Sequence, residues 1–499
     1  MDDISLQFAY HPSIFPYSSL QDPGDIEPYL KDESNFQGEA TQIFFPRDQD
    51  ELTELLYFSQ KRSHPVTISA NRTSLTGAAI PFTGDILSLE KMPEAPIHWN
   101  GNRCFMQAGM NYGLLQEEVN KQGFYLPVDP TSSPDCSIGG AVATNCSGSR
   151  SFKYGSLRNY VCYLEIMLPT GESLKLRRGQ HYLTKNTIIN SPLRREITPP
   201  LLNHHFINTV KNTTGYYNSK RLDLIDCFIG SEGTLGIVLT VGLELLRLPA
   251  QQLLLLVPVN RSDDVLRLWS SLKEKMKILL PEKLCAMDYI DAASCRLLSK
   301  TFDSKFIPEG GYFILELESK NTTEDLLLIF ADFMEKEEFA TEGILIGDEL
   351  QTARRIRALR HEIPESINQI VRHQGRSKTA MDFSVPHESF PALFDKYLDL
   401  QSNSPFPVYI FGHIGEQNLH VNMLPAGKKE KQQASDIVKD IASWILDKGG
   451  TLSSEHGIGK TKRNLMKLAY TNNEYQRMKE FKLFWDPANI LNRGNIFDE

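Results

Sequence analysis

Residues 137–148 read Ser-Ile-Gly-Gly-Ala-Val-Ala-Thr-Asn-Cys-Ser-Gly, and small side chains occupy nearly every position of this run. Two further runs share that composition, Thr73–Gly77 upstream and Gly230-Ser-Glu-Gly-Thr-Leu-Gly236 downstream. A pyrophosphate needs several backbone N–H groups aimed at one point, and only small residues let the backbone come so close. One such loop alone is more typical of an ordinary tight turn. Three of them predict a large, extended ligand that several loops hold together.

The segments around these runs predict strands and helices in alternation. Gln42–Pro46 and Val66–Ser69 have the pattern of short strands, and Glu51–Lys61 between them has the spacing of an amphipathic helix. This βαβ-like opening leads into the loop at 69–77, and Ile237–Leu246 is predicted as an alternating strand behind the third run. The chain has no G-x-G-x-x-G after its first strand and no G-x-x-x-x-G-K-[ST]. Neither a Rossmann dinucleotide site nor a P-loop is therefore supported.

A change of character near residue 250 indicates a domain boundary. Loop glycines become fewer there, and from Ser262 onward amphipathic helices alternate with apolar strands such as Tyr312–Leu317 and Val408–Phe411. The segment Trp485–Asn492 is rich in turn residues and is expected to close back on the first domain. We therefore expect an α+β chain with a first domain, a second domain and a returning tail at residues 36–249, 250–480 and 481–499.

Composition and charge argue against several classes of protein. The net charge of the 499 residues is −9, which argues against nonspecific binding to nucleic acid or to an anionic membrane. The seven cysteines form no C-x-x-C pair, so a disulfide scaffold, a zinc ribbon and a conventional iron–sulfur cluster are not expected. The acidic start lacks an apolar signal region, and the longest apolar run, Leu253–Val259, is too short to span a bilayer. We expect a cytoplasmic protein without a transmembrane segment, with any membrane contact peripheral to the inner face.

A set of histidines and a carboxylate in the second half predicts a metal site. His413 and His420 lie seven residues apart, a spacing that places them on opposite sides of a straight strand. A turn at Gly415–Asn418 would bring them together, and Glu455 and His456 follow in a glycine-flanked loop. Two histidines and a glutamate with an open position are a common catalytic ligand set for zinc or another divalent transition metal. A lone histidine is more typical of the surface or of a hydrogen-bonded core, so the prediction rests on the set.

The motifs of both halves resemble one known family. In 127–172 these are Gly139-Gly140, Thr144-Asn145, Ser147-Gly148, Tyr154-Gly155 and Arg158-Asn-Tyr-Val161, and the run 230–236 follows in the family's order. They resemble the FAD-binding domain of the vanillyl-alcohol oxidase type, in the branch of D-lactate dehydrogenases, glycolate oxidase large subunits and D-2-hydroxyglutarate dehydrogenases. The resemblance extends from about residue 36 to the C-terminus. It implies a two-subdomain FAD-binding domain plus a cap domain with an antiparallel sheet flanked by helices.

The resemblance also implies which residues hold the cofactor. The loop at 69–77 lacks the histidine that carries covalently attached flavin in some relatives, so the FAD is expected to be noncovalent. Ala70-Asn-Arg72 stands where the family has a glycine run, and Arg72 either points outward or adds a cation near the pyrophosphate. The residues expected to bind FAD are Thr73, Ser74, Leu75, Thr76, Gly77, Pro130, Thr131, Gly139, Gly140, Thr144, Asn145, Ser147, Gly148, Glu232, Gly233, Gly236, Ile237 and Asn492.

For the second half, the resemblance assigns chemical roles. The positions that match the family's metal ligands are His413, His420 and Glu455, with zinc the expected ion, and the position of the catalytic base is His456. Glu416 and Gln417 replace the family's usual Asp and Gly between the two histidines. The segment Leu359-Arg360-His-Glu-Ile-Pro364 resembles the one whose arginine grips the substrate carboxylate. Arg360 is therefore the first candidate to bind substrate, and Lys378 the second.

The implied function is the FAD-dependent oxidation of a small D-2-hydroxy acid, with D-lactate or glycolate foremost. Electrons would pass to a quinone, a cytochrome or another flavoprotein. Two alternatives stay open at this point. One is a non-redox flavoenzyme of the alkylglycerone-phosphate synthase type, which the histidine set disfavours. The other is a noncatalytic FAD-binding subunit of a glycolate-oxidase-like complex, which the altered loop at 70–72 keeps open.

Overall fold

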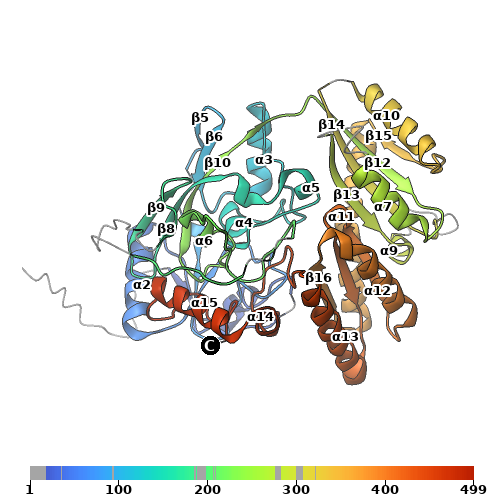
Figure 1. Cartoon of the computed structure of the whole chain (residues 1–499). Helices are drawn as coiled ribbons and strands as arrows, with labels where there is room; N and C mark the ends of the chain where they lie inside the picture. The colour runs from blue at the N-terminus through green and yellow to red at the C-terminus, as the bar shows by residue number, and fades with distance from the viewer. Residues whose placement is uncertain are drawn as a thin grey trace, which may run out of the picture.

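In the described part of the chain, the computed structural model contains four β-sheets (Figure 1). The structure describes residues 18–34, 36–92, 95–184, 187, 198–205, 207, 209–275, 283–298, 307–320 and 322–498. The expectation of a missing signal region rests on residues 1–18, nearly all of which lie outside these ranges. Within them, no helix combines the length and the hydropathy that crossing a membrane would require.

The first sheet contains the βαβ-like opening. Its strand order is β1 (Ser19–Leu20), β2 (Ile43–Phe44), β4 (Asp85–Ser88) and β3 (Val66–Ser69). β2 and β3 both pair with β4 in parallel, and α2 (Gln49–Arg62) connects them. The helix begins at Asp48, whose carboxylate accepts a hydrogen bond from the Glu51 N–H, and ends at Ser63 in the left-handed conformation. The short elements beside this sheet are α1 (Pro23–Ile26), η1 (Glu27–Tyr29) and η2 (Leu89–Lys91).

The second sheet is antiparallel and supports the glycine-rich loops. Its order is β5 (His98–Asn100), β6 (Arg103–Gln107), β10 (Ile237–Glu244), β8 (Val161–Met167) and β9 (Ser173–Arg177). β10 is buried at nearly every position, so the expected alternation is wrong: as the central strand it is covered on both faces. A two-stranded ribbon pairs β7 (Phe124–Tyr125) with β11 (Leu246–Arg247). The helices around this sheet are α3 (Tyr112–Lys121), α4 (Ile138–Thr144), α5 (Ser151–Tyr154), η3 (Leu157–Asn159) and α6 (Leu224–Phe228).

A seven-stranded sheet forms the second half of the chain. Its order is β15 (Leu345–Gly347), β12 (Gln251–Pro258), β14 (Tyr312–Ser319), β13 (Leu284–Ile290), β17 (Val408–His413), β18 (Asn418–Met423) and β16 (Thr379–Ser384). All its paired strands are antiparallel. Together with the sheets of the first half, this arrangement confirms the expected α+β class and the expected antiparallel sheet of the second domain.

Helices flank both faces of this sheet, and the twofold periodicity of the strands decides which side chains meet which helix. Leu254, Ile290 and Phe411 pack against the apolar side of α11 (Leu350–Gln374) on one face. Leu255 and Tyr289, which are the sequence neighbours of Leu254 and Ile290, belong to the other face. The remaining elements of this half are α7 (Asp264–Glu274), α9 (Ala292–Leu297), α10 (Thr323–Lys336), η5 (His387–Ser389), α12 (Phe390–Asn403), η6 (Ile414–Glu416) and α13 (Gly427–Asp447). The face covered by α11 also carries the polar residues described below.

The chain returns to its first half after α13. Figure 1 shows α15 (Asn472–Trp485), in red, against the first half of the chain, with α14 (Arg463–Ala469) between α15 and α13. Trp485 packs edge-on to Phe228, and Phe481 to Tyr216. Contacts with the first half also occur before α14, because the N–H groups of Ile458 and Gly459 donate to the Glu232 carboxylate; the boundaries at 249 and 480 stay predictions.

Candidate active site

One large cavity brings together the loops of the first half and the polar face of the seven-stranded sheet. Its volume is about 1520 Å³, which exceeds the pockets that hold a single drug-sized molecule. The three small-residue runs line one part of it, and strands β13, β16, β17 and β18 line another. A dinucleotide and a small second molecule would therefore share one space.

Most residues expected to bind FAD line this cavity, but three do not: Thr76, Gly77 and Asn145. Asn145 instead ends α4 in the left-handed conformation, and its side-chain oxygen accepts a hydrogen bond from the Arg158 N–H. Gly148 shows why small residues are needed here, because a Cβ atom at this position would lie 2.1 Å from the Asp129 carbonyl oxygen. Small residues in this run therefore also allow two backbone segments to pack closely, and the predicted approach to a pyrophosphate stays a prediction.

Arg72 has a defined place at the edge of the first loop. Its backbone is left-handed (φ 54°), its guanidinium lies over the Tyr29 ring at 4.3 Å, and Nη1 pairs with Glu90 at 2.9 Å. The Glu90 carboxylate compensates the positive charge. Arg72 also lines the cavity, so of the two alternatives the structure favours a cation at the cavity wall, paired with Glu90, over a side chain that points outward.

The C-terminal tail ties the loops to one another. The Asn492 side chain accepts a hydrogen bond from the Ile68 N–H at 2.8 Å and donates to the Glu232 carbonyl at 2.8 Å. The Glu232 carboxylate in turn accepts from the N–H groups of Ile458 and Gly459. Asn492 thus lines the cavity and also links the first and third loops to the segment that follows His456.

The hairpin between β17 and β18 brings His413 and His420 together. Their rings lie 5.4 Å apart, and η6 makes the turn between the strands. Gln417 holds the left-handed position of that turn (φ 57°), which is where the family has glycine. Glu455 Oε2 lies 3.3 Å from His413 Nε2 and 3.5 Å from His420 Nε2. Ligand atoms around a tetrahedral zinc ion are about 3.4 Å apart, so these three side chains fit such an ion.

The second oxygen of Glu455 is already engaged. Oε1 accepts a hydrogen bond from Ser147 Oγ at 3.0 Å and forms an ion pair with the buried Lys211 ammonium. Lys211 Nζ also lies 2.9 Å from Glu416 and donates to the Gly148 carbonyl. Only Oε2 faces the histidines, so Glu455 would bind a metal through one oxygen.

The negative charges around His413 favour the binding of a cation. Burial alone would lower its pKa, but the carboxylates of Glu455 and Asp288 outweigh burial and raise that pKa to about 10. Asp288 Oδ1 lies 2.7 Å from His413 Nδ1, on the side of the ring away from Glu455. A carboxylate at Nδ1 fixes the ring of a metal-binding histidine and leaves Nε2 for the ion. The donor set and its charge thus suit a divalent cation.

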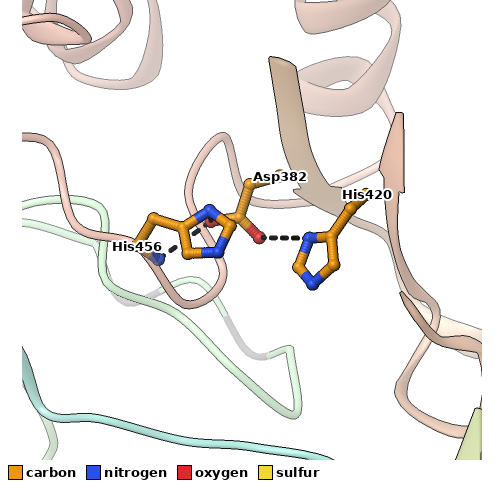
Figure 2. A group of neighbouring side chains, drawn as sticks. All are labelled: Asp382, His420 and His456. Carbon is orange, nitrogen blue, oxygen red and sulfur yellow. Dashed lines mark hydrogen bonds and ion pairs between the residues drawn. The ribbon is translucent and has the colours of Figure 1, made fainter. Parts of the chain in front are cut away.

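Figure 2 shows Asp382 between the rings of His420 and His456. Asp382 Oδ2 lies 3.2 Å from His456 Nδ1, and Oδ1 lies 3.8 Å from His420 Nδ1. These three residues offer a second arrangement of metal-ligand type. The Asp382 carboxylate, however, already accepts hydrogen bonds from the N–H groups of Glu455 and His456 and from the Asn418 side chain. It is better placed to orient the two imidazoles than to bind an ion.

His456 has the properties of a proton acceptor. Its side chain lines the cavity, and burial lowers its pKa to about 4 despite the opposing charge of Asp382. The imidazole is therefore neutral at pH 7. With Nδ1 beside Asp382, Nε2 remains to accept a proton.

Arg360 and Lys378 line the same cavity. Arg360 Nε lies 2.6 Å from Asp288 in an ion pair, and neither Nε nor Nη2, both buried, has a hydrogen-bond partner among the described residues. Lys378 donates to Asn368 Oδ1 at 2.9 Å, and burial lowers its pKa. All six residues expected to do chemistry therefore meet in one cavity with the predicted flavin loops.

Reasoning from the sequence missed the residues that hold this set in place: Asp288, Asp382, Lys211 and Ser149. A usable signal exists for the two aspartates. In Leu-Cys-Ala-Met-Asp-Tyr-Ile (284–290) and Thr-Ala-Met-Asp-Phe-Ser (379–384), one acid interrupts an otherwise uncharged strand. Such an acid is almost never buried without a partner. For Lys211 and Ser149 the sequence offers no comparable signal.

Comparisons with known proteins agree with this geometry. The profile of an FAD binding domain matches residues 40–177, and the profile of the FAD linked oxidases, C-terminal domain, matches residues 248–496. The chain is 26% identical over 498 residues to the D-2-hydroxyglutarate dehydrogenase of Stutzerimonas stutzeri, covering 97% of this chain and 96% of that one. It is 25% identical over 459 residues to the D-lactate dehydrogenase of Archaeoglobus fulgidus, with 90% of each chain covered.

The solved structure of an alkyldihydroxyacetonephosphate synthase shares the fold, with a TM-score of 0.63 at 15% identity over 95% of this chain and 81% of that one. Fold and profiles together define a flavoprotein of the vanillyl-alcohol oxidase type. Within that class, the chain belongs to the family of FAD linked oxidases.

Proposed function

We propose that this protein oxidises a small D-2-hydroxy acid to the 2-oxo acid, with noncovalent FAD and a divalent metal, zinc foremost, in the cavity. The observation that carries the proposal is the convergence of a neutral imidazole, a ligand set of two histidines and a glutamate, and a partly unpaired arginine in one space with the flavin loops. The relatives named for D-2-hydroxyglutarate and D-lactate support the class of substrate. D-lactate and glycolate are the first substrates to test.

The chemistry divides between the cofactors and the chain. Bound FAD supplies the acceptor for the C2 hydride, and a divalent cation supplies positive charge beside the substrate oxygens. The chain supplies the proton acceptor, which is His456 Nε2, and Asp382 holds the ring and stabilises its positive charge after the transfer. His456 would take the hydroxyl proton of the substrate, and bound FAD would supply the acceptor for the C2 hydride, which together account for a two-electron oxidation.

Arg360 and Lys378 would bind the carboxylate of the substrate. A guanidinium with one edge against Asp288 and Nη2 unpaired presents a donor to an incoming carboxylate. Lys378 adds a second, partly buried cation on the cavity wall. Burial makes both attractions stronger than they would be in water.

The alternative, a noncatalytic FAD-binding subunit, predicts a cavity without a catalytic set of side chains. A subunit that only carried FAD would have no need of a buried Asp382–His456 pair or of two histidines facing a carboxylate. The experiment is a panel of D- and L-2-hydroxy acids assayed with an artificial acceptor dye, with the 2-oxo acid identified as product. Oxidation of a D-acid, lost in chelator and restored by Zn²⁺, supports the proposal. No product from any acid in the metal-loaded, flavin-loaded protein would refute it.

A further inference from the structure

Asp288 contacts three functional parts of the protein at once. It is 3% exposed and lies on β13, the strand next to β17, with its carboxylate on the face that α11 covers. His413 Nδ1 lies 2.7 Å from Oδ1. Oδ2 accepts a hydrogen bond from Ser149 Oγ at 2.6 Å and forms an ion pair with Arg360 Nε at 2.6 Å.

The contact with Ser149 is one of four that a single segment makes. Ser147 donates to Glu455, the Gly148 carbonyl accepts from Lys211, and Ser149 donates to Asp288. Arg150 then forms a buried ion pair with Glu316 at 2.7 Å. The predicted flavin loop thus runs directly along the side chains that surround the metal-ligand set.

Glu316 is the second carboxylate near Arg360, but it is the weaker partner. Its Oε2 lies 3.8 Å from Arg360 Nη1, against 2.6 Å for the contact between Arg360 Nε and Asp288. Asp288 is therefore the stronger influence on the direction of the guanidinium.

We propose that Asp288 is a positioning residue that fixes the metal ligand His413 and the carboxylate-binding Arg360 relative to each other and, through Ser149, to the flavin loop. This inference rests on the proposed function and adds to it that one carboxylate serves both binding sites. Losing that carboxylate would loosen the two sites together, although Asp288 itself touches neither metal nor substrate.

The physical reason is that His413 and Arg360 each contact Asp288 through one nitrogen, which leaves another nitrogen for binding. The His413 ring, held at Nδ1, presents Nε2 toward Glu455 Oε2. The Arg360 guanidinium, ion-paired at Nε, belongs to a side chain that lines the cavity, and its Nη2 has no hydrogen-bond partner among the described residues. Removing the carboxylate behind a metal-binding histidine typically weakens metal affinity about 10- to 100-fold. A guanidinium released from its ion pair also loses the fixed orientation that favours bidentate binding of a carboxylate.

The test compares Asp288→Asn with Arg360→Lys in the full chain loaded with FAD. Zn²⁺ affinity is measured without substrate, by competition with a chromophoric chelator. The KM and kcat for the best acid of the panel are measured at saturating Zn²⁺. Asp291→Asn is the matched control, because Asp291 is 2% exposed just beyond the same strand, and it caps α9 through the Ser294 N–H, a role that asparagine can also fill.

Asp288→Asn is expected to weaken Zn²⁺ binding at least about tenfold and, at saturating Zn²⁺, to raise KM about tenfold or more with a smaller change in kcat. Arg360→Lys should raise KM and leave Zn²⁺ affinity within about twofold, and the control should leave both unchanged. An Asp288→Asn protein that changes only one of the two quantities contradicts the shared role. Unchanged Zn²⁺ affinity in a variant that still oxidises the acid overturns the inference and leaves the proposed function intact. A wild-type protein that binds no Zn²⁺ overturns both.

Discussion

Ser147 Oγ donates a hydrogen bond to Glu455 Oε1 at 3.0 Å, and this contact joins residues 308 positions apart in the chain. Ser147 belongs to the run expected to approach the flavin, and Glu455 to the set expected to bind a metal. The two halves of the chain are therefore in contact at residues expected to bind the flavin and the metal. The position of Glu455 is set from the flavin side as much as from its own loop.

Ser147→Ala should weaken metal binding moderately. The variant removes one of the two partners of Glu455 Oε1, and a hydrogen bond to a charged group typically contributes about 1.5 to 3 kcal/mol. We expect Zn²⁺ affinity to fall about tenfold, measured by chelator competition. Ser271→Ala is the matched control, because Ser271 also donates to a glutamate, Glu337, and neither residue lines the cavity. An equal loss in both variants would mean that the contact does not act on the metal site.

Lys211→Met should make folding dependent on the metal. Lys211 is the cation between two buried carboxylates, Glu416 and Glu455, and removing one partner of a buried ion pair typically costs about 3 to 5 kcal/mol. In chelator the melting temperature should drop sharply, and Zn²⁺ should restore more of it than in the wild type, because the metal neutralises Glu455. Lys482→Met removes the partner of buried Asp486 and should be destabilising without any response to Zn²⁺.

His204 should make the protein less stable in mild acid. Burial lowers its pKa to about 4, against about 6.5 in the unfolded chain, and its Nε2 lies 2.8 Å from the Tyr216 carbonyl. Between pH 6.5 and 4 the unfolded state binds the proton more readily, so stability is full above pH 6.5 and falls as the pH falls. The loss should approach about 1.4 kcal/mol per pH unit within that window. Urea denaturation at pH 7 and pH 5 should show a smaller difference in His204→Asn than in the wild type; equal differences would exclude this role.

His456→Asn should remove activity and keep both cofactors. Without the proton acceptor, kcat should fall at least about 100-fold, whereas the visible flavin spectrum and Zn²⁺ affinity should stay close to wild type. Asp382→Asn should lower kcat as well, because the ring loses the carboxylate that orients it. A His456→Asn protein with more than a tenth of the wild-type kcat would assign the proton transfer to another group.

The sequence alone predicted the parts of this structure that depend on local patterns. The βαβ opening and the turn that brings His413 and His420 together follow from periodicity and turn residues. Strand alternation also explains why the side chains of His420 and Asp382, paired across β18 and β16, stand on the same face.

The remaining parts depend on contacts between distant segments. Ser149 lies 139 residues from Asp288, and the local sequence around either residue does not predict the contact. The burial of β10 on both faces likewise depends on how the layers stack. Arg72 was ambiguous for the same reason, since Glu90 and Tyr29 become its neighbours only in the folded protein.

The most direct test of the proposed function is the flavin absorbance of the Zn²⁺-loaded protein under anaerobic conditions, recorded after adding D-lactate, L-lactate, glycolate or D-2-hydroxyglutarate. We expect at least one acid to bleach the flavin within seconds and D-lactate to react far faster than its enantiomer. Pretreatment with a chelator should abolish the bleaching, and added Zn²⁺ should restore it. Flavin that stays oxidised with every acid, or bleaches equally well in the chelator-treated protein, would contradict the account.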